Sequence, residues 1–487
     1  MNEDALQNLL PEKTARELMA VPLRVENGSV IFMVPDGFNG DQLDLLSLAT
    51  GKWIKLEYAG EAEVKQKLNE LYGTKAGPKS SSSSFRYRVY SKNDNVDVTS
   101  LRRQLDTAPI VKLVDEIITS GIKWGASDIH IEPSAKQVRV RYRLDGKLQE
   151  TMPIPPEKKQ AVISRIKVMA ELDIAERRRP QDGRIRVEGE DRVVDMRVSV
   201  IPTDFGEKVV IRILDKSQLR LELESLGMNT SQLELFREKL TKPNGIILVT
   251  GPTGSGKTTT LYAALNHIMS SETNIITIED PIEYNLEGIN QSQVKPEIGY
   301  TFANALRTFL RQDPDIIMVG EIRDHETAEI AVRASLTGHL VLSTLHTNDA
   351  ASAITRLVNM NVEPYLIASS LSMIVAQRLV RLLCHECKTE YKPTVIELEK
   401  LNLDSKSDYR FYIPNGCDKC LGTGYSGRLG VFEILNVDDD IASLILNRAP
   451  LNDYRDKIKT TSYGLLRANA IELLLAGKTS FAEISTL

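Results

Sequence analysis

The chain has 487 residues, of which 42% are hydrophobic and 26% charged, an ordinary composition for a soluble globular protein. The formal net charge is −5, so overall charge gives no indication of a nucleic-acid-binding protein. No apolar run reaches about 18 residues, and the N-terminus MNEDALQNLLPEK lacks the basic start and apolar core of a signal peptide. We therefore expect a cytoplasmic protein of about three domains.

Three regions follow one another along the chain. Residues 1–73 are expected to form a small N-terminal domain, because SVIFMVPD (29–36) is typical of a strand that ends in a turn. The stretch GTKAGPKSSSSS (73–84) predicts a flexible linker, which we assign to residues 74–98. Residues 99–222 contain fifteen arginines, and strand-like alternation in QVRVRYRLDGKL and RVVDMRVSVIP predicts an α+β domain.

Residues 223–487 change pattern. The short apolar runs GIILVTG, NIITIED, DIIMVGE and GHLVLSTLH alternate with longer helical stretches. This alternation is the signature of a parallel sheet covered by helices, so an α/β fold is predicted.

The first of these runs leads into a phosphate-binding loop. GPTGSGKT (251–258) matches G-x-x-x-x-G-K-[ST], and it lies between a strand-like run and a helical stretch, as the motif requires. Backbone N–H groups and the helix N-terminus would hold an anion here, Lys257 would reach the β- and γ-phosphates, and the Thr258 hydroxyl would bind Mg²⁺. The expected nucleotide-binding residues are Gly251, Pro252, Thr253, Gly254, Ser255, Gly256, Lys257, Thr258 and Thr259.

Acidic residues end the next two runs. Asp280 follows one run directly, and Glu321 follows the other behind a glycine. Because ligands of parallel α/β sheets lie at the carboxyl ends of the strands, we expect these carboxylates to face the phosphate loop. Our hypothesis is that Glu321 contacts hydrated Mg²⁺ and Glu279 orients the attacking water, although the two roles could be exchanged. The alternative is that Glu279 and Asp280 only cap a turn before Pro281.

The fourth run carries His339 and His346. A histidine after a strand could sense the γ-phosphate or move a proton, and the alternative is a structural histidine. Two histidines within one such segment, at a strand expected beside the nucleotide, leave both interpretations open.

The four cysteines fall into two C-x-x-C pairs, Cys384 with Cys387 and Cys417 with Cys420. Each pair places two thiolates on one turn, and two turns complete a tetrahedron around Zn²⁺. The interval 388–416 is longer than the usual gap of about 15–20 residues, but loop closure costs little more for it. Structural zinc is favoured over a redox pair, disulfides or unpaired thiols.

Taken together, GPTGSGKTTT, ITIEDPIEY, IIMVGEIRD and GHLVLSTLHTND resemble the Walker A, Asp-box, Walker B and His-box segments of the type II secretion and type IV pilus assembly ATPases. ASDIHIEP (126–133) and RRRPQDGRI (177–185) resemble segments of the preceding domain in that family, and the resemblance runs from about residue 99 to the C-terminus. It implies a homo-hexameric motor with a RecA-like core, fuelled by ATP with Mg²⁺. It also implies a PAS-like domain that supplies arginines to the nucleotide, with Arg178, Arg184 and Arg192 as candidates.

The tetracysteine motif resembles that of the pilus-extension and secretion members, since retraction motors typically lack it. Residues 1–73 resemble the family's N-terminal modules only weakly; such modules dock on a membrane-associated partner or, in some members, bind a cyclic dinucleotide, and docking is preferred here. The resemblance therefore implies an ATPase that assembles a pilus or a secretion pseudopilus through an inner-membrane platform protein. The alternatives are a nucleic-acid translocase, which the acidic balance disfavours, and a non-hydrolysing nucleotide-gated scaffold, which the intact site residues disfavour.

Overall fold

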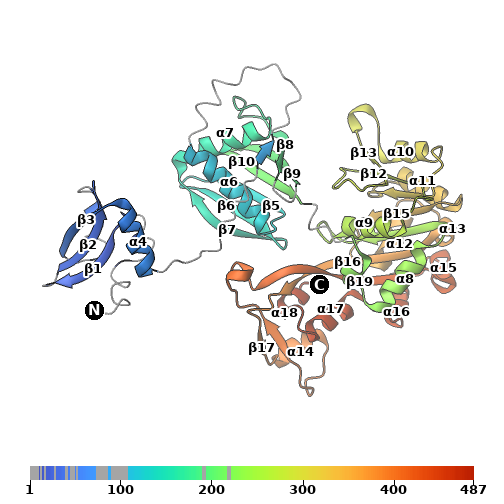
Figure 1. The fold of residues 1–487 in the computed structure, drawn as a ribbon. Coiled ribbons are helices and arrows are strands. Elements are labelled where there is room, and N and C mark those ends of the chain that lie inside the picture. The colour runs from blue at the N-terminus through green and yellow to red at the C-terminus, as the bar shows by residue number, and fades with distance from the viewer. Residues whose placement is uncertain are drawn as a thin grey trace. The chain divides into compact units, whose positions relative to one another are not determined.

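The computed structural model describes residues 10, 14–15, 18–26, 29–38, 42–43, 46, 50, 53–72, 86–88, 108–188, 193–215 and 221–487. The chain divides into two compact units, residues 1–84 and 85–487 (Figure 1). Most of the linker expected at 74–98 lies outside the described residues. Its residues 86–88 are not linker, however, because their alternating sequence RYR forms a strand that pairs with the edge of a sheet.

The first unit contains a three-stranded sheet with a helix against it. Strand β1 pairs antiparallel with β2, and β2 pairs parallel with β3. The core is built from alternate residues of β2 (Val30, Phe32, Val34) and from Val64 and Leu68, which lie one helical turn apart. The elements are β1 (Val21–Glu26), β2 (Ser29–Pro35), β3 (Trp53–Ala59) and α4 (Glu61–Tyr72).

The second unit begins with a seven-stranded antiparallel sheet. The alternating sequence of β6, VRVRYRL, buries Val138, Val140 and Tyr142 and leaves its arginines on the opposite face. Two α-helices contribute to the same core, one through Ile117 and the other through Ile163, so the predicted α+β domain is present. In spatial order the strands are β4 (Arg86–Arg88), β8 (Gln181–Glu188), β9 (Val193–Thr203), β10 (Gly206–Leu214), β5 (Asp128–Pro133), β6 (Val138–Leu144) and β7 (Lys147–Ile154), and the helices are α6 (Ala108–Lys123), η1 (Pro156–Lys158) and α7 (Lys159–Met169).

A second seven-stranded sheet carries the phosphate loop. Its strands from β13 to β16 are parallel, and β19 joins antiparallel at the edge. In spatial order they are β13 (Asn290–Gln293), β12 (Ile275–Glu279), β14 (Ile316–Val319), β15 (Leu340–Leu345), β11 (Gly245–Thr250), β16 (Leu371–Leu383) and β19 (Tyr425–Asn436).

Helices cover both faces of this sheet. In β11, Ile247 and Val249 pack in one core with Leu261 of α9, whereas Ile246 and Leu248 pack in another with Ala331 of α11. The central strands are therefore buried on both sides, as parallel strands require. The helices are η3 (Leu223–Ser225), α8 (Thr230–Leu240), α9 (Lys257–Ile268), η4 (Pro296–Ile298), α10 (Phe302–Phe309), α11 (His325–Leu336), α12 (Ala350–Asn359), α13 (Pro364–Ser370), α15 (Asp439–Leu446) and α16 (Leu451–Lys459).

The long strands β16 and β19 continue beyond the sheet into a small subdomain (Figure 1). It has its own core, in which Phe411 and Leu398 pack with Leu474 and Ile484 from the C-terminal helices. Its elements are β17 (Thr389–Tyr391), α14 (Val395–Leu401), β18 (Phe411–Ile413), η5 (Asp418–Cys420), α17 (Leu466–Leu475) and α18 (Phe481–Ile484). Among the described residues, no helix combines the length and apolar character needed to span a membrane.

Candidate nucleotide site and cysteine cluster

The phosphate loop leaves β11 and enters α9, which begins at Lys257. Gly256 has φ +90°, a conformation that favours glycine, and a Cβ there would lie 2.8 Å from Nε2 of Gln377 on β16, so the amide of Gln377 would have to move. The Lys257 ammonium donates hydrogen bonds to the carbonyl oxygens of Gly251 (2.9 Å) and Pro252 (3.1 Å). These two hydrogen bonds close the loop around the ammonium of Lys257.

The electrostatics of Lys257 show which groups lie near it. Burial lowers its pKa, the Glu321 carboxylate opposes that shift, and the Arg378 guanidinium adds to it. Thr258 is exposed in the first turn of α9, where its hydroxyl could bind a metal beside the phosphates. A carboxylate, a hydroxyl and an ammonium around one loop are a donor set that fits Mg²⁺ and a polyphosphate.

The predicted site residues follow neighbouring strands at the same edge of the sheet. Gly251, Asp280, Glu321 and His346 come directly, or after one residue, behind β11, β12, β14 and β15, which are parallel to one another. The structure therefore brings these residues to one edge. The side chain of Glu321 is 13% exposed, pairs with Arg323, and lies 3.2 Å from Nε2 of His346.

Glu279 occupies a different environment from the one we expected. It is only 3% exposed, and its carboxylate accepts hydrogen bonds from Thr277 (2.7 Å), Gln291 (2.9 Å) and the hydroxyl of Tyr262. Burial, together with this carboxylate, raises the pKa of Tyr262. With its oxygens held inside the domain, Glu279 is poorly placed to orient water, and this geometry favours a structural role that fixes the Asp-box segment on α9.

Glu283, four residues later, has an accessible carboxylate. Its side chain is 30% exposed and its Oε2 lies 3.5 Å from the guanidinium of Arg197 on β9. Arg197 also donates a hydrogen bond of 2.6 Å to the carbonyl oxygen of Ile282. This arginine of the preceding domain thus contacts the segment that follows β12.

The two histidines lie at opposite ends of strand β15. His339 precedes β15 at its amino end, where its Nδ1 lies 2.9 Å from the carbonyl oxygen of Ala334 in α11. Of the two interpretations left open for His339, this position favours the structural one, because in a parallel sheet the amino ends of the strands face away from the ligand. His346 follows the same strand at its carboxyl end and contacts Glu321.

The three predicted arginines differ in position. Arg178 is 88% exposed and pairs with Glu176, and Arg184 is exposed on β8, directly opposite Arg197 of β9. Arg192 lies outside the described residues. Sequence reasoning missed Arg197 because several strand arginines of this domain alternate with apolar residues in the same way, and its contact with Glu283 depends on how the domains pack.

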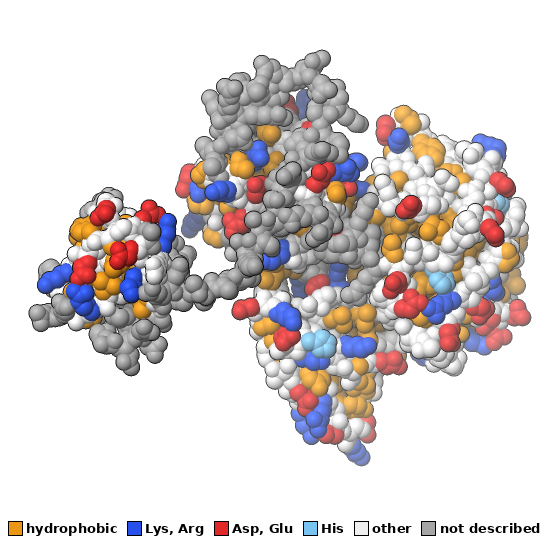
Figure 2. All heavy atoms as spheres, in the orientation of Figure 1, with side chains coloured by type: hydrophobic (Ala, Val, Ile, Leu, Met, Phe, Trp, Pro, Cys, Tyr) orange, Lys and Arg blue, Asp and Glu red, His pale blue; other side chains and the backbone are white. Residues whose placement is uncertain are grey.

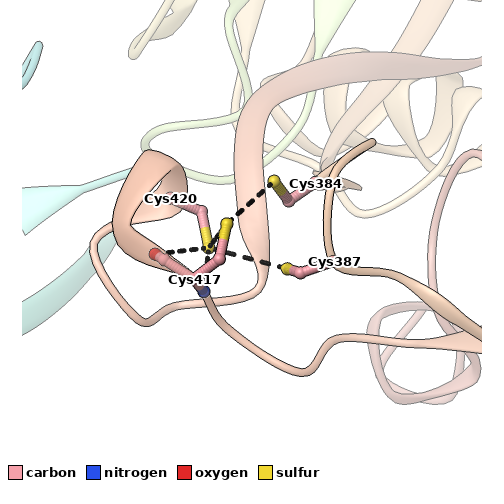
Figure 3. Close-up of side chains that lie close together, drawn as sticks. All are labelled: Cys384, Cys387, Cys417 and Cys420. Atoms are coloured by element: carbon pink, nitrogen blue, oxygen red, sulfur yellow. Dashed lines mark hydrogen bonds between the residues drawn. The ribbon is translucent and has the colours of Figure 1, made fainter.

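The four cysteines form one cluster from two loops (Figure 3). Their sulfur atoms lie within 4.8 Å of one another, and the separations are 3.9 Å for Cys384–Cys417, 3.8 Å for Cys387–Cys420 and 3.7 Å for Cys417–Cys420. A tetrahedral zinc with Zn–S bonds near 2.3 Å places its sulfurs about 3.8 Å apart. All four thiols are free, so the residues present fit zinc.

The loop around the second pair stabilises a thiolate. Burial alone would raise the pKa of Cys420, but N–H groups of Cys417 (3.1 Å) and Gly424 (3.2 Å) donate to its sulfur and lower the pKa to about 6. Gly416 has φ +91°, and a Cβ there would lie 2.5 Å from the carbonyl oxygen of Gly422. The tight turn that gathers the cysteines therefore requires this glycine.

These features define a class: a P-loop nucleotide hydrolase with a RecA-like parallel sheet. The chain belongs to the Type II/IV secretion system protein family, whose sequence profile matches residues 103–486. The MshEN domain profile matches residues 2–78. The predicted fold class, the family and the ATP hydrolase activity are confirmed.

Two relatives illustrate the similarity. The type IV pilus assembly ATPase PilB of Myxococcus xanthus (strain DK1622) is 43% identical over 497 residues, covering 99% of this chain and 86% of the relative. The type II secretion system ATPase E of Vibrio cholerae serotype O1 is 46% identical over 434 residues, covering 87% and 85%. Both kinds of machine named in our expectation are therefore represented among its relatives.

Solved structures agree on the fold. The pilus retraction motor PilT with bound ADP matches with a TM-score of 0.51 and 28% identity, covering 76% of this chain and 95% of that one. The ATPase DotB of Legionella pneumophila matches with a TM-score of 0.55 and 21% identity, covering 77% and 94%, and supports the fold alone.

Proposed function

We propose that this ATPase powers assembly of a type IV pilus or of a type II secretion pseudopilus. The observation that carries the proposal is the convergence of Lys257, Glu321 and His346 at one edge of the parallel sheet. Relatives of both kinds, a pilus assembly ATPase and a secretion ATPase, support this function over a translocase or an inactive scaffold.

Within the site, residues 251–259 hold the phosphates, and Thr258 and Glu321 hold Mg²⁺, which neutralises charge on the transferred phosphoryl group. Glu283 takes over the role first given to Glu279 and orients the attacking water, because its carboxylate is accessible whereas that of Glu279 is buried. Arg197 stabilises negative charge from the side of the preceding domain, together with Arg178 and Arg184 when the domains close.

The wider assembly is also part of the proposal. The chain works as a homo-hexamer in the cytoplasm, held at the inner face of the membrane by a platform protein, with residues 1–73 as a docking domain for a membrane-associated partner. Zn²⁺ bound by Cys384, Cys387, Cys417 and Cys420 fixes the small subdomain. Nucleic acid is not a partner. Acidic and basic side chains are interspersed over the described part of the face in Figure 2.

Phosphate release by the purified full chain tests the site. Glu321→Gln and Glu283→Gln should each lower kcat about 100-fold, since each removes a group that acts on the metal or the water. The matched control is Glu287→Gln, an exposed glutamate of the same segment, which should keep the parental rate. Near-parental rates for both Glu321→Gln and Glu283→Gln would refute the assignment.

A further inference from the structure

Five consecutive residues that follow β15 each contact a different part of the second unit. The segment His346–Ala350 links the nucleotide site to the last strand and to a C-terminal helix, and we call it the junction. Its contacts are His346 with Glu321 after β14 (3.2 Å), Thr347 with Thr250 of β11 (2.7 Å), Asn348 with Arg378 of β16 (3.0 Å), Asp349 with Arg455 of α16 (2.6 Å), and Ala350 with Glu433 of β19 (3.0 Å).

The first two contacts fix the nucleotide side of the junction. The N–H of Thr347 donates to the hydroxyl of Thr250 (3.0 Å), the last residue of the strand that carries the phosphate loop. His346 then stands beside Glu321, the acidic residue at the end of the neighbouring strand. The position of His346 relative to Glu321 thus depends on where the junction backbone is held.

Two charged residues hold the other side. Glu433 is 3% exposed, and its carboxylate accepts hydrogen bonds from the N–H groups of Ala350 (3.0 Å) and Leu466 (3.1 Å), the first residues of α12 and α17. Arg455 donates to Asp349, whose other oxygen caps α12 through the N–H of Ser352 (2.8 Å). A carboxylate at a helix N-terminus is favourable, and one that spans two such ends fixes both.

Neither Glu433 nor Arg455 has a described contact with the phosphate loop or with Glu321. A buried carboxylate is costly unless its hydrogen bonds are complete, and packing alone could be served by an apolar side chain. We propose that Glu433 and Arg455 are positioning residues for ATP hydrolysis: they hold the junction so that His346 keeps its contact with Glu321. The inference rests on the proposed site, in which Glu321 holds Mg²⁺ and His346 acts through its contact with Glu321.

The test compares Arg455→Met and Glu433→Gln with Lys457→Met in the full chain. Lys457 lies on the same helix as Arg455 but pairs with Asp440 at the surface, so its variant removes one charge from α16 without touching the junction. Arg455→Met and Glu433→Gln should lower kcat roughly 10- to 100-fold, as loss of an outer partner of a reacting group does, with KM for ATP within about twofold. Lys457→Met should keep both constants, and Arg455→Lys should recover part of kcat. Rates are expressed per nucleotide-binding site, so a partly unfolded preparation is corrected for.

A double variant separates positioning from general stability. If Arg455 acts through His346, His346→Ala with Arg455→Met should be no slower than His346→Ala alone, because the group being positioned is already absent. The inference would be overturned, with the proposed site left intact, by either of two results. One is a double variant whose loss of kcat equals the product of the two single losses. The other is a parental kcat for Arg455→Met and Glu433→Gln. A parental kcat for His346→Ala would instead overturn the role of His346 in the site, and the inference with it.

Discussion

Replacing Cys420 by serine should abolish high-affinity zinc binding. Cys420 is 6% exposed, and its sulfur lies 3.7 Å from Cys417 and 3.8 Å from Cys387, so the cluster already has the edge length of a ZnS₄ tetrahedron. Because little backbone movement is needed, we expect one zinc per parental chain with a binding free energy of about 10–16 kcal/mol, which corresponds to roughly tens of nanomolar down to picomolar affinity.

The assay is competition between the full chain and a colorimetric chelator, together with metal analysis of the purified protein. Cys420→Ser should retain less than about a tenth of the parental zinc, since one of four ligands is lost. The small subdomain has its own core around Phe411, so zinc loss should lower its melting temperature while ATP binding persists. Micromolar affinity in the parental chain, or a disulfide in place of bound metal, would refute the reasoning.

Further predictions concern stability in acid, the phosphate loop and Arg197. Although burial would raise the pKa of Glu132, hydrogen bonds from Arg141 and Lys208 lower it from 4.5 to about 2. The stabilising effect of the Glu132 carboxylate is therefore present above about pH 4.5 and is lost as the pH falls towards 2. The melting temperature of Glu132→Gln should fall less steeply across that range than that of the parental chain. An identical pH profile for the two proteins would contradict this. Gly256→Ala should weaken ATP binding at least about 10-fold in a fluorescence titration. A left-handed conformation costs an alanine about 1–2 kcal/mol, and its Cβ would contact the side chain of Gln377. Parental affinity would show that the loop relaxes freely. Arg197→Ala should lower kcat about 10-fold or more in the phosphate-release assay. The control Arg333→Ala removes a surface partner of Glu329 and should keep the parental kcat. Equal effects of the two variants would refute a specific role of Arg197 in hydrolysis.

The sequence was sufficient for the fold and for much of the site, because local signals and sheet geometry agree there. Glycines at fixed spacing before a helix predict the phosphate loop, and an acidic residue directly after a buried run predicts a side chain at the ligand edge, as found for Glu321. Two C-x-x-C pairs likewise predict the cysteine cluster.

The sequence alone did not predict the surroundings of three side chains. His339 stands one residue before its strand, and the parallel direction of β15 places it at the far edge from His346. Glu279 is the last residue of its strand rather than the first after it, so its carboxylate turns inward to Tyr262. Arg197 was one arginine among fifteen in its domain, and only tertiary packing distinguishes it.

Strand β16 sets the spacing between the nucleotide and the cysteines. Gln377 lies against Gly256, and Cys384 follows the end of the same strand, about 23 Å further on at 3.3 Å per residue. A single inserted residue would exchange every later side chain between the two surfaces of the strand, whereas an inserted pair would lengthen it by about 7 Å and keep each surface as it is. The strand therefore acts as a spacer of fixed length, and a single extra residue would need a bulge such as the irregularity that already interrupts its pairing with β19 between Arg381 and Leu383.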